Sequence, residues 1–116
     1  MSPVLDRASI LQFTAAKSLP TQPCDVPQLG GTVLVRTMTG IERDRFEEVQ
    51  RQVKLANFRG RFAAATLCDA EGTRLFGDGD AETLGNLPST ALDRVYDVAS
   101  KLNGIGSDVE ASAEKN

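Results

Sequence analysis

The sequence predicts a mainly helical α+β fold: a compact helical domain with a small N-terminal β-hairpin and a disordered acidic C-terminal tail. Three observations support this prediction. Two segments repeat apolar residues at the three- and four-residue spacing of amphipathic helices. A segment near position 33 alternates as a strand does. The residues after position 105 are small, polar and acidic, which is typical of disorder.

Length and composition exclude several classes of function. The 116 residues have the size of one domain. The net charge of −3 argues against a nucleic-acid partner held through its phosphates. No run approaches the ~18 apolar residues of a membrane span, and we expect no signal peptide. Cys24 and Cys68 are expected to be two reduced thiols.

The first predicted elements lie in the N-terminal third. Residues 6–17 can form a short helix. Residues 23–38 are predicted to form the β-hairpin, with the turn PQLGG between its strands and with Val33 and Val35 on one side of the second strand. Because two strands alone are marginally stable, this ribbon is expected to lie on a helix.

Residues 40–56 give the clearest helix signal. Thr39 followed by Glu42 matches the capping box, in which each side chain bonds an unpaired amide at the helix start. An apolar stripe follows at helical spacing: Phe46, Val49, Val53 and Ala56. We expect this stripe to pack in the core of the protein's own domain rather than on a partner. Glu47 and Arg51 are expected to pair on the solvent side.

Residues 58–68 are ambiguous between a helix and a strand. The helix is favoured, because Phe58 and Phe62 then share a face, with Gly60 as a weak point. The alternative is a strand over residues 62–68 that turns at DAEG into TRLF.

Residues 69–85 most resemble a metal site, since they combine five acidic side chains with four glycines. A calcium-binding EF-hand loop needs oxygen ligands at positions 1, 3 and 5, glycine at position 6 and glutamate at position 12. A loop that starts at Asp78 has Thr83 at position 6, and one that starts at Asp69 has Arg74 there. Both registers fail, so no metal ligand is assigned.

The same residues are interpreted as a turn followed by a helix start. Asp69 can bond the backbone two residues on, and Gly72 supplies a positive φ. Residues 79–84 are predicted to form a short helix, with Asp78 or Asp80 as its N-cap.

Residues 88–103 are predicted to form the last helix. Pro88 fits the first turn, with Ser89 or Asn86 as a cap. Its buried stripe is Leu92, Val95, Ala99 and Leu102. The Asn-Gly pair at 103–104 is typical of a helix end.

No residue is assigned a catalytic, cofactor-binding or metal-binding role. The chain has no histidine, which excludes Ser-His and Cys-His nucleophiles. The glycines at 29–31 and 104–106 lack the lysine and the strand-to-helix context of a phosphate loop. Acids interleave with the arginines of residues 43–54, which indicates a solvated helix face. We therefore expect a non-enzymatic binding protein without a cofactor.

Three segments in a fixed order carry a family resemblance: VRTMTGIERDRFE, CDAEGTRLF and LPSTALDRVYDVASKLNG. Together they resemble the tail assembly chaperones of long-tailed, siphovirus-like bacteriophages and prophages. The resemblance divides the chain into a poorly defined segment 1–21, a chaperone-like domain 22–105 and a disordered tail 106–116. It carries over no binding or catalytic residue.

The resemblance implies a function in virion morphogenesis. Such proteins bind the tape-measure protein and keep it soluble until tail-tube subunits polymerise around it. They act in the cytoplasm of the host cell and are not expected in the mature virion. The implied partners are the tape-measure protein, tail-tube subunits and a longer form of the chain itself, without nucleic acid or membrane. Self-association stays open.

The longer form would arise by programmed frameshift, which is frequent in this family near the 3′ end of the gene. The chain ends in Glu-Lys-Asn. These residues can be encoded as GAA AAA AAC, which contains the slippery heptamer A AAA AAC. On this hypothesis residues 106–116 are a linker in the longer product. The alternative is a polar end that carries these residues by chance.

Two other functions remain open from the sequence. The chain can be a structural virion component, such as a head–tail adaptor or a minor tail protein, or a small inhibitor of a host protein. An adaptor is present in purified particles, whereas a chaperone is absent from them. An enzyme would need a metal, which would raise the melting temperature in the presence of calcium.

Overall fold

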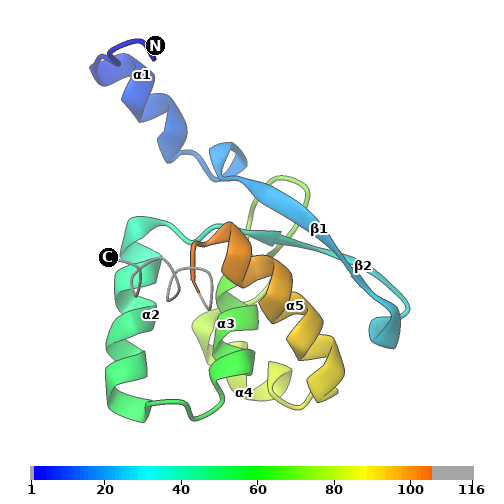
Figure 1. Cartoon of the computed structure of the whole chain (residues 1–116). Helices are drawn as coiled ribbons and strands as arrows, with labels where there is room; N and C mark the ends of the chain where they lie inside the picture. Colours follow the sequence, from blue (N-terminus) through cyan, green and yellow to red (C-terminus); the bar gives the residue numbers. More distant parts are fainter. Residues whose placement is uncertain (1, 106–116) are drawn as a thin grey trace, which may run out of the picture.

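A small three-stranded antiparallel sheet with helices packed against it forms the centre of the molecule (Figure 1). The computed structural model describes residues 2–105. The strands follow the spatial order β1 (Thr21–Val26), β2 (Gly31–Arg36), β3 (Leu67–Cys68). The helices are α1 (Arg7–Leu11), α2 (Gly40–Val53), α3 (Phe58–Thr66), α4 (Ala81–Leu84) and α5 (Ser89–Leu102). The predicted α+β class is confirmed.

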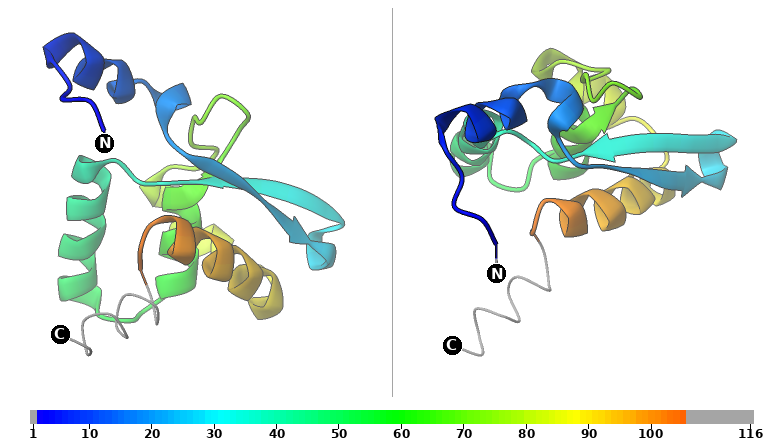
Figure 2. Two further views of the ribbon diagram at one scale, coloured as in Figure 1. Left: turned by 45° about the horizontal axis from the view of Figure 1, so that its top comes forward. Right: turned by 90° about the horizontal axis from the view of Figure 1, so that it is seen from above.

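The β1–β2 hairpin forms as predicted. Cys24 lies opposite Val33 in the antiparallel register, so both side chains share one face of the ribbon. On this face the Cys24 Sγ lies 3.4 Å from the carbonyl oxygen of Arg94 in α5. The turn, η3 (Pro27–Leu29), ends at Gly30 with a φ of 80°. Figures 1 and 2 show α5 along the ribbon, which confirms that the hairpin lies on a helix.

The predicted capping box starts α2. The Thr39 hydroxyl accepts from the Glu42 amide at 3.1 Å, and the Glu42 carboxylate accepts from the Thr39 amide at 2.9 Å. The helix ends at Val53, before the predicted residue 56, because Lys54 takes a positive φ of 57°.

The ion pairs on the outer side of α2 differ from the prediction. Arg51 pairs with Glu48, and Glu47 pairs with Arg43 at 3.3 Å. The predicted pair of Glu47 with Arg51 was therefore wrong, because neighbours at both three- and four-residue spacing compete on a helix surface.

The helix predicted over residues 58–68 is confirmed up to Thr66, and its last two residues are a strand instead. Leu67 is extended, with a φ of −68° and a ψ of 129°. It lies opposite Val35 of β2, and Cys68 lies opposite Leu34. The alternative of a strand that turns at DAEG into TRLF is thus borne out over Leu67–Cys68, because Cys68 also forms a bridge with Arg74 across that turn.

Gly60 is a point of close packing rather than a weak point. It is buried in α3, and a Cβ there would lie 2.5 Å from the carbonyl oxygen of Ala81. The side chain of Asn57 fills the remaining space and donates from Nδ2 to the same carbonyl at 2.9 Å. Glycine is therefore required by the approach of α4 to α3.

The turn after β3 is confirmed. The Asp69 Oδ1 accepts from the Glu71 amide at 2.8 Å, and Gly72 has a φ of 78°. The predicted helix over residues 79–84 is also present, as η4 (Asp78–Asp80) followed by α4.

Of the two predicted N-caps, Asp80 takes the N-cap position of α4 but makes no side-chain cap bond there, and Asp78 is not a cap. Neither Asp78 nor Asp80 accepts from an amide of the turn that follows it. Asp80 instead accepts from the preceding Gly77 amide at 2.8 Å, and Asp78 accepts from the Arg74 guanidinium at 2.8 Å. A nearby arginine therefore holds Asp78 away from the cap.

The last helix, α5, buries the predicted stripe and ends at Asn103, with Gly104 at a φ of 67°. Of the stripe, only Leu102 is half-buried rather than buried. The predicted caps at its start were wrong. Pro88 takes the N-cap position without a side-chain bond, and Asn86 donates to the Glu82 carbonyl at 3.2 Å.

One cluster of buried apolar side chains joins the sheet to α3, α4 and α5. Four aromatic rings at the edge of this cluster contact one another: Phe46, Phe58, Phe62 and Tyr96. Within residues 2–105, no helix is both long and apolar enough to cross a membrane.

Residues 2–20 form an arm that projects from the body (Figure 1). It holds α1, capped by the Asp6 carboxylate at 2.9 Å from the Ser9 amide, and two short 3-10 helices. The predicted helix within residues 6–17 is confirmed. None of the arm residues is buried. The domain boundaries stay a prediction, and the predicted disordered tail 106–116 lies outside the described residues.

Candidate functional site: a cleft between α2 and α3

The apolar stripe of α2 lines an open cleft instead of packing in the core. None of the residues of α2 is buried. Phe46 and Val49 are half-buried, whereas Val53 is 41% exposed and Ala56 is also exposed. The prediction that Phe46, Val49 and Val53 belong to the core was therefore wrong for Val49 and Val53, whereas Phe46 packs against the core cluster from the cleft side. The physical reason is that α2 stands at the side of α3, away from most of the sheet, so that among residues 2–105 it is α3 that mainly covers it (Figure 1).

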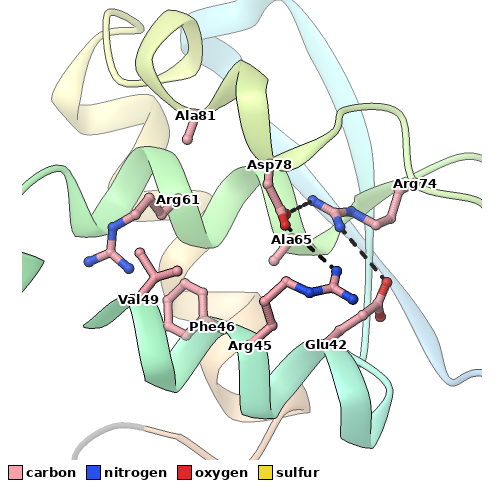
Figure 3. Close-up of a pocket in the computed structure, with 9 residues that line it drawn as sticks. All are labelled: Glu42, Arg45, Phe46, Val49, Arg61, Ala65, Arg74, Asp78 and Ala81. Atoms are coloured by element: carbon pink, nitrogen blue, oxygen red, sulfur yellow. Dashed lines mark hydrogen bonds and ion pairs between the residues drawn. The ribbon is translucent and has the colours of Figure 1, made fainter. Parts of the chain in front are cut away.

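The cleft has a volume of about 220 Å³ and opens between α2, α3 and the start of α4 (Figure 3). Its floor is apolar and consists of Phe46, Val49, Ala65 and Ala81. Its rim is charged and consists of Glu42, Arg45, Arg61, Arg74 and Asp78. An apolar floor inside a charged rim is the usual composition of a binding site.

Aromatic contacts hold the floor in place. The Phe46 ring lies 5.6 Å from the Phe62 ring and, edge to face, 5.6 Å from the Phe58 ring. Such pairs stabilise by about 1 kcal/mol beyond the area they bury. Because Phe62 is itself buried, the core positions the cleft floor.

At one end of the cleft, Glu42 forms ion pairs with two arginines. Its Oε2 lies 2.6 Å from the Arg36 Nη2 and 3.9 Å from the Arg74 Nη1. Burial alone would raise the pKa of Glu42, but the Thr39 amide and the two arginines together hold that pKa below its usual value. Glu42 therefore stays ionised and joins β2, α2 and the loop that carries Arg74.

Arg74 and Arg45 share Asp78 across the mouth of the cleft. The Arg74 guanidinium donates to the Ala64 carbonyl at 3.0 Å and 2.8 Å, which fixes it against α3. It also donates to Asp78 at 2.8 Å. Arg45 lies 3.7 Å from Asp78 and its side chain is 55% exposed. Hydrogen bonds to Ala64 and Asp78 thus fix the Arg74 side chain, whereas Arg45 has only a long ion pair with Asp78.

Arg61 marks the other end of the cleft. Its guanidinium lies over the rings of Phe46 and Phe58, at 5.2 Å and 5.8 Å from the ring centres. Its Nη2 donates to the Gln50 side chain at 3.1 Å and to the Lys54 carbonyl at 3.0 Å. The Nη1 is buried without a hydrogen-bond partner, and burial lowers the pKa of Arg61.

The cleft fits binding rather than catalysis. Its ionisable side chains are arginines and carboxylates that mostly satisfy one another, without a nucleophile paired to a base. In the described part of the chain, residues 2–105, no cluster of three or more Cys, Asp or Glu side chains could hold a metal.

The two cysteines lie outside the cleft as buried, free thiols, as expected. Burial raises the pKa of both the Cys24 and the Cys68 thiol. A raised pKa leaves little thiolate at neutral pH, so neither cysteine is suited to nucleophilic chemistry.

Sequence reasoning assigned no site residue and therefore missed this cleft. The signal was the stripe Phe46 and Val49 on a helix rich in arginine. Arg61 and Arg74, which complete the rim, gave no local signal, because only the packing of α3 and its following loop against α2 brings them there.

No protein-family model matches this sequence, and no curated protein matches it either. A solved structure does match: that of the bacteriophage HK97 tail assembly chaperone, with a TM-score of 0.60 and 18% identity. The match covers 86% of this chain and 96% of that one. It agrees with the resemblance carried by the sequence segments around α2, β3 and α5. The chain therefore has the fold of a bacteriophage tail assembly chaperone.

Proposed function

We propose that this protein is a tail assembly chaperone of a long-tailed bacteriophage or prophage. The observation that carries the proposal is the fold match to the HK97 chaperone, which extends over almost the whole of that chain. The ordered sequence resemblance supports the same function independently of the coordinates. The proposed role is non-enzymatic and belongs to the host cytoplasm during virion assembly.

The proposed client is the tape-measure protein, which the chain would keep soluble until the tail tube polymerises around it. A long, apolar, helical client needs a small partner that offers apolar surface. This chain has two such surfaces. One is the α2–α3 cleft, and the other is the arm, with five exposed apolar side chains: Val4, Leu5, Ile10, Leu11 and Phe13. The arm also offers a surface for self-association.

Co-expression tests the chaperone role. The tape-measure protein of the same phage or prophage is expressed alone and together with this chain, and its soluble fraction is measured after centrifugation. We expect the client to be soluble only in the presence of the chain and to co-purify with it. A client that is equally insoluble in both cases would contradict the proposal.

Purified particles distinguish the chaperone from the virion component. Mass spectrometry of mature phage should detect tube and tape-measure peptides but no peptides of this chain. Peptides at stoichiometric abundance would favour a head–tail adaptor or a minor tail protein.

The programmed frameshift needs its own measurement, because its site lies in residues 106–116, outside the described part of the chain. Mass spectrometry of the products of the gene with its native downstream DNA should reveal a minor product that leaves the frame near Lys115. A single product that ends at Asn116 would contradict the frameshift and leave the chaperone role untouched.

A further inference from the structure

We propose that the α2–α3 cleft binds a helical client segment in which one large aliphatic side chain is flanked by carboxylates. The identity of the client as a tape-measure protein rests on the proposed function, but the chemistry of the segment follows from the cleft alone. The aliphatic side chain contacts the floor, and the carboxylates pair with arginines of the rim.

The size of the cleft selects a side chain rather than a small molecule. Its volume of about 220 Å³ is below the about 300 to 1,000 Å³ of ordinary ligand pockets. The floor residues Phe46, Val49 and Ala65 offer no hydrogen-bonding side chain to a polar ligand. A leucine-like anchor on an amphipathic helix meets both conditions, since such helices dock single side chains into short grooves.

The charge of the rim selects carboxylates beside that anchor. Three arginines and two carboxylates line the cleft: Arg45, Arg61 and Arg74 against Glu42 and Asp78. This excess of positive charge stands out on a chain whose net charge is −3. An acidic segment is therefore complementary to the arginines of this rim.

Two of these arginines have N–H donors that are available to a further acceptor. Arg45 is more than half exposed and reaches Asp78 only at 3.7 Å, so it can turn toward another carboxylate. Arg61 has a buried Nη1 without a partner, and an unpaired buried donor is unfavourable until an acceptor arrives. The two lie at opposite ends of the floor (Figure 3), so acidic residues on both sides of the anchor fit best.

Nucleic acid fits this surface less well than an acidic helix. Phosphate binding relies on an open basic face. Here an apolar floor separates the guanidinium groups, and Arg45 and Arg74 already face Asp78. A single-stranded oligonucleotide therefore serves as a probe that competes with the peptide.

The test uses the full-length chain, labelled with ¹⁵N and ¹³C, and three helical peptides that share one central leucine. The leucine is flanked four residues before and three residues after by glutamate, by glutamine or by lysine. We expect the glutamate peptide to shift the methyl signals of Val49 and Ala65. Its Kd should be about tenfold lower than that of the glutamine peptide, because two exposed charge pairs together contribute a binding free energy of about that size. The lysine peptide should bind more weakly still.

Matched variants locate the site. Arg45→Gln should reduce the preference for glutamate over glutamine from about tenfold to about threefold, because it removes one of the two charge pairs. It should leave the fold intact, because the Arg45 side chain is exposed. Arg59→Gln is the control, since Arg59 lies on α3 but pairs with Asp93 of α5 at 2.5 Å and does not line the cleft. It should leave the preference intact.

Several outcomes would overturn this inference. The first two are equal Kd values for the three peptides and methyl shifts that map away from the cleft. The other two are an equal loss of the glutamate preference in both arginine variants, and displacement of the glutamate peptide by a single-stranded oligonucleotide at a concentration below that of the peptide. Failure here is separable from failure of the chaperone role. If Arg45→Gln and wild type both keep the tape-measure protein soluble and the peptides do not bind, the chaperone stands and its client site lies elsewhere.

Discussion

At the scale of single residues, the Glu42 side chain makes two different stabilising contacts. It completes the capping box of α2 and forms the partly buried pair with Arg36, whose side chain is only 4% exposed. A sequence pattern reveals the first contact, since it is local. The second joins α2 to β2 and keeps the carboxylate ionised, with consequences for stability at low pH.

Because the pKa of Glu42 is lowered in the folded protein, the unfolded chain binds protons more readily as the pH falls. Its contribution to stability is fully present above the ordinary value of 4.5 and is lost as the pH drops through the folded value. We expect the melting temperature to fall between pH 7 and pH 4, and to fall less in Glu42→Gln, which keeps the shape of the capping box. Calorimetry at both pH values measures this. An identical fall in both proteins would contradict the role of Glu42.

Gly60 provides a second prediction at the residue scale. Helix propensity alone predicts that Gly60→Ala stabilises by up to about 1 kcal/mol. The structure predicts the opposite sign, because the new Cβ meets the Ala81 carbonyl oxygen at 2.5 Å, and such overpacking costs about 1 to 3 kcal/mol. Urea denaturation measures the difference. Gly40→Ala is the control, since nothing lies within 4 Å of a Cβ there. A stabilised Gly60→Ala would show that α4 can move away.

At the scale of elements, α2 differs from the other two long helices. Six residues of α3 and five of α5 are buried, whereas α2 has none. Elements with few buried contacts open at lower free energy than the core does. We expect amides of α2 to exchange with deuterium faster than those of α3 and α5, and mass spectrometry of peptic fragments measures this. Equal protection of the three helices would mean that α2 unfolds only with the whole domain.

At the scale of the whole molecule, we expect the arm to lie outside the cooperative unit, since its contact with the body is confined to its last residues, where the Ala16 backbone lies against Gly72. Residues 2–20 contain no buried residue, and five large apolar side chains of the arm are exposed. We expect a chain without residues 2–18 to unfold within about 0.5 kcal/mol of the full chain, as for other changes away from the core. Urea denaturation tests this, with ultracentrifugation of both chains as a control for association. A loss of several kcal/mol would place the arm within the folded unit.

Much of this fold could be predicted from the sequence because the decisive signals are local. The capping box at Thr39, the turn glycines at positions 30 and 72, the stripe of α5 and its Asn-Gly end each depend on residues a few positions apart. Such contacts form within one turn or helix, whatever packs against it. The sequence by itself therefore determined the fold class and most of the elements, and its ordered segments resembled a family of which the HK97 chaperone has a similar fold.

Only the tertiary structure decided how these elements share their surfaces. It paired Leu67 and Cys68 with β2, made Gly60 a close contact and brought Arg74 to Glu42 at the mouth of the cleft. It also left the stripe of α2 half-covered, which the periodicity of that helix alone does not reveal. The physical reason is that an amphipathic face shows that a partner is needed but does not identify it. Here α3 covers only part of the face, and the uncovered part is the cleft.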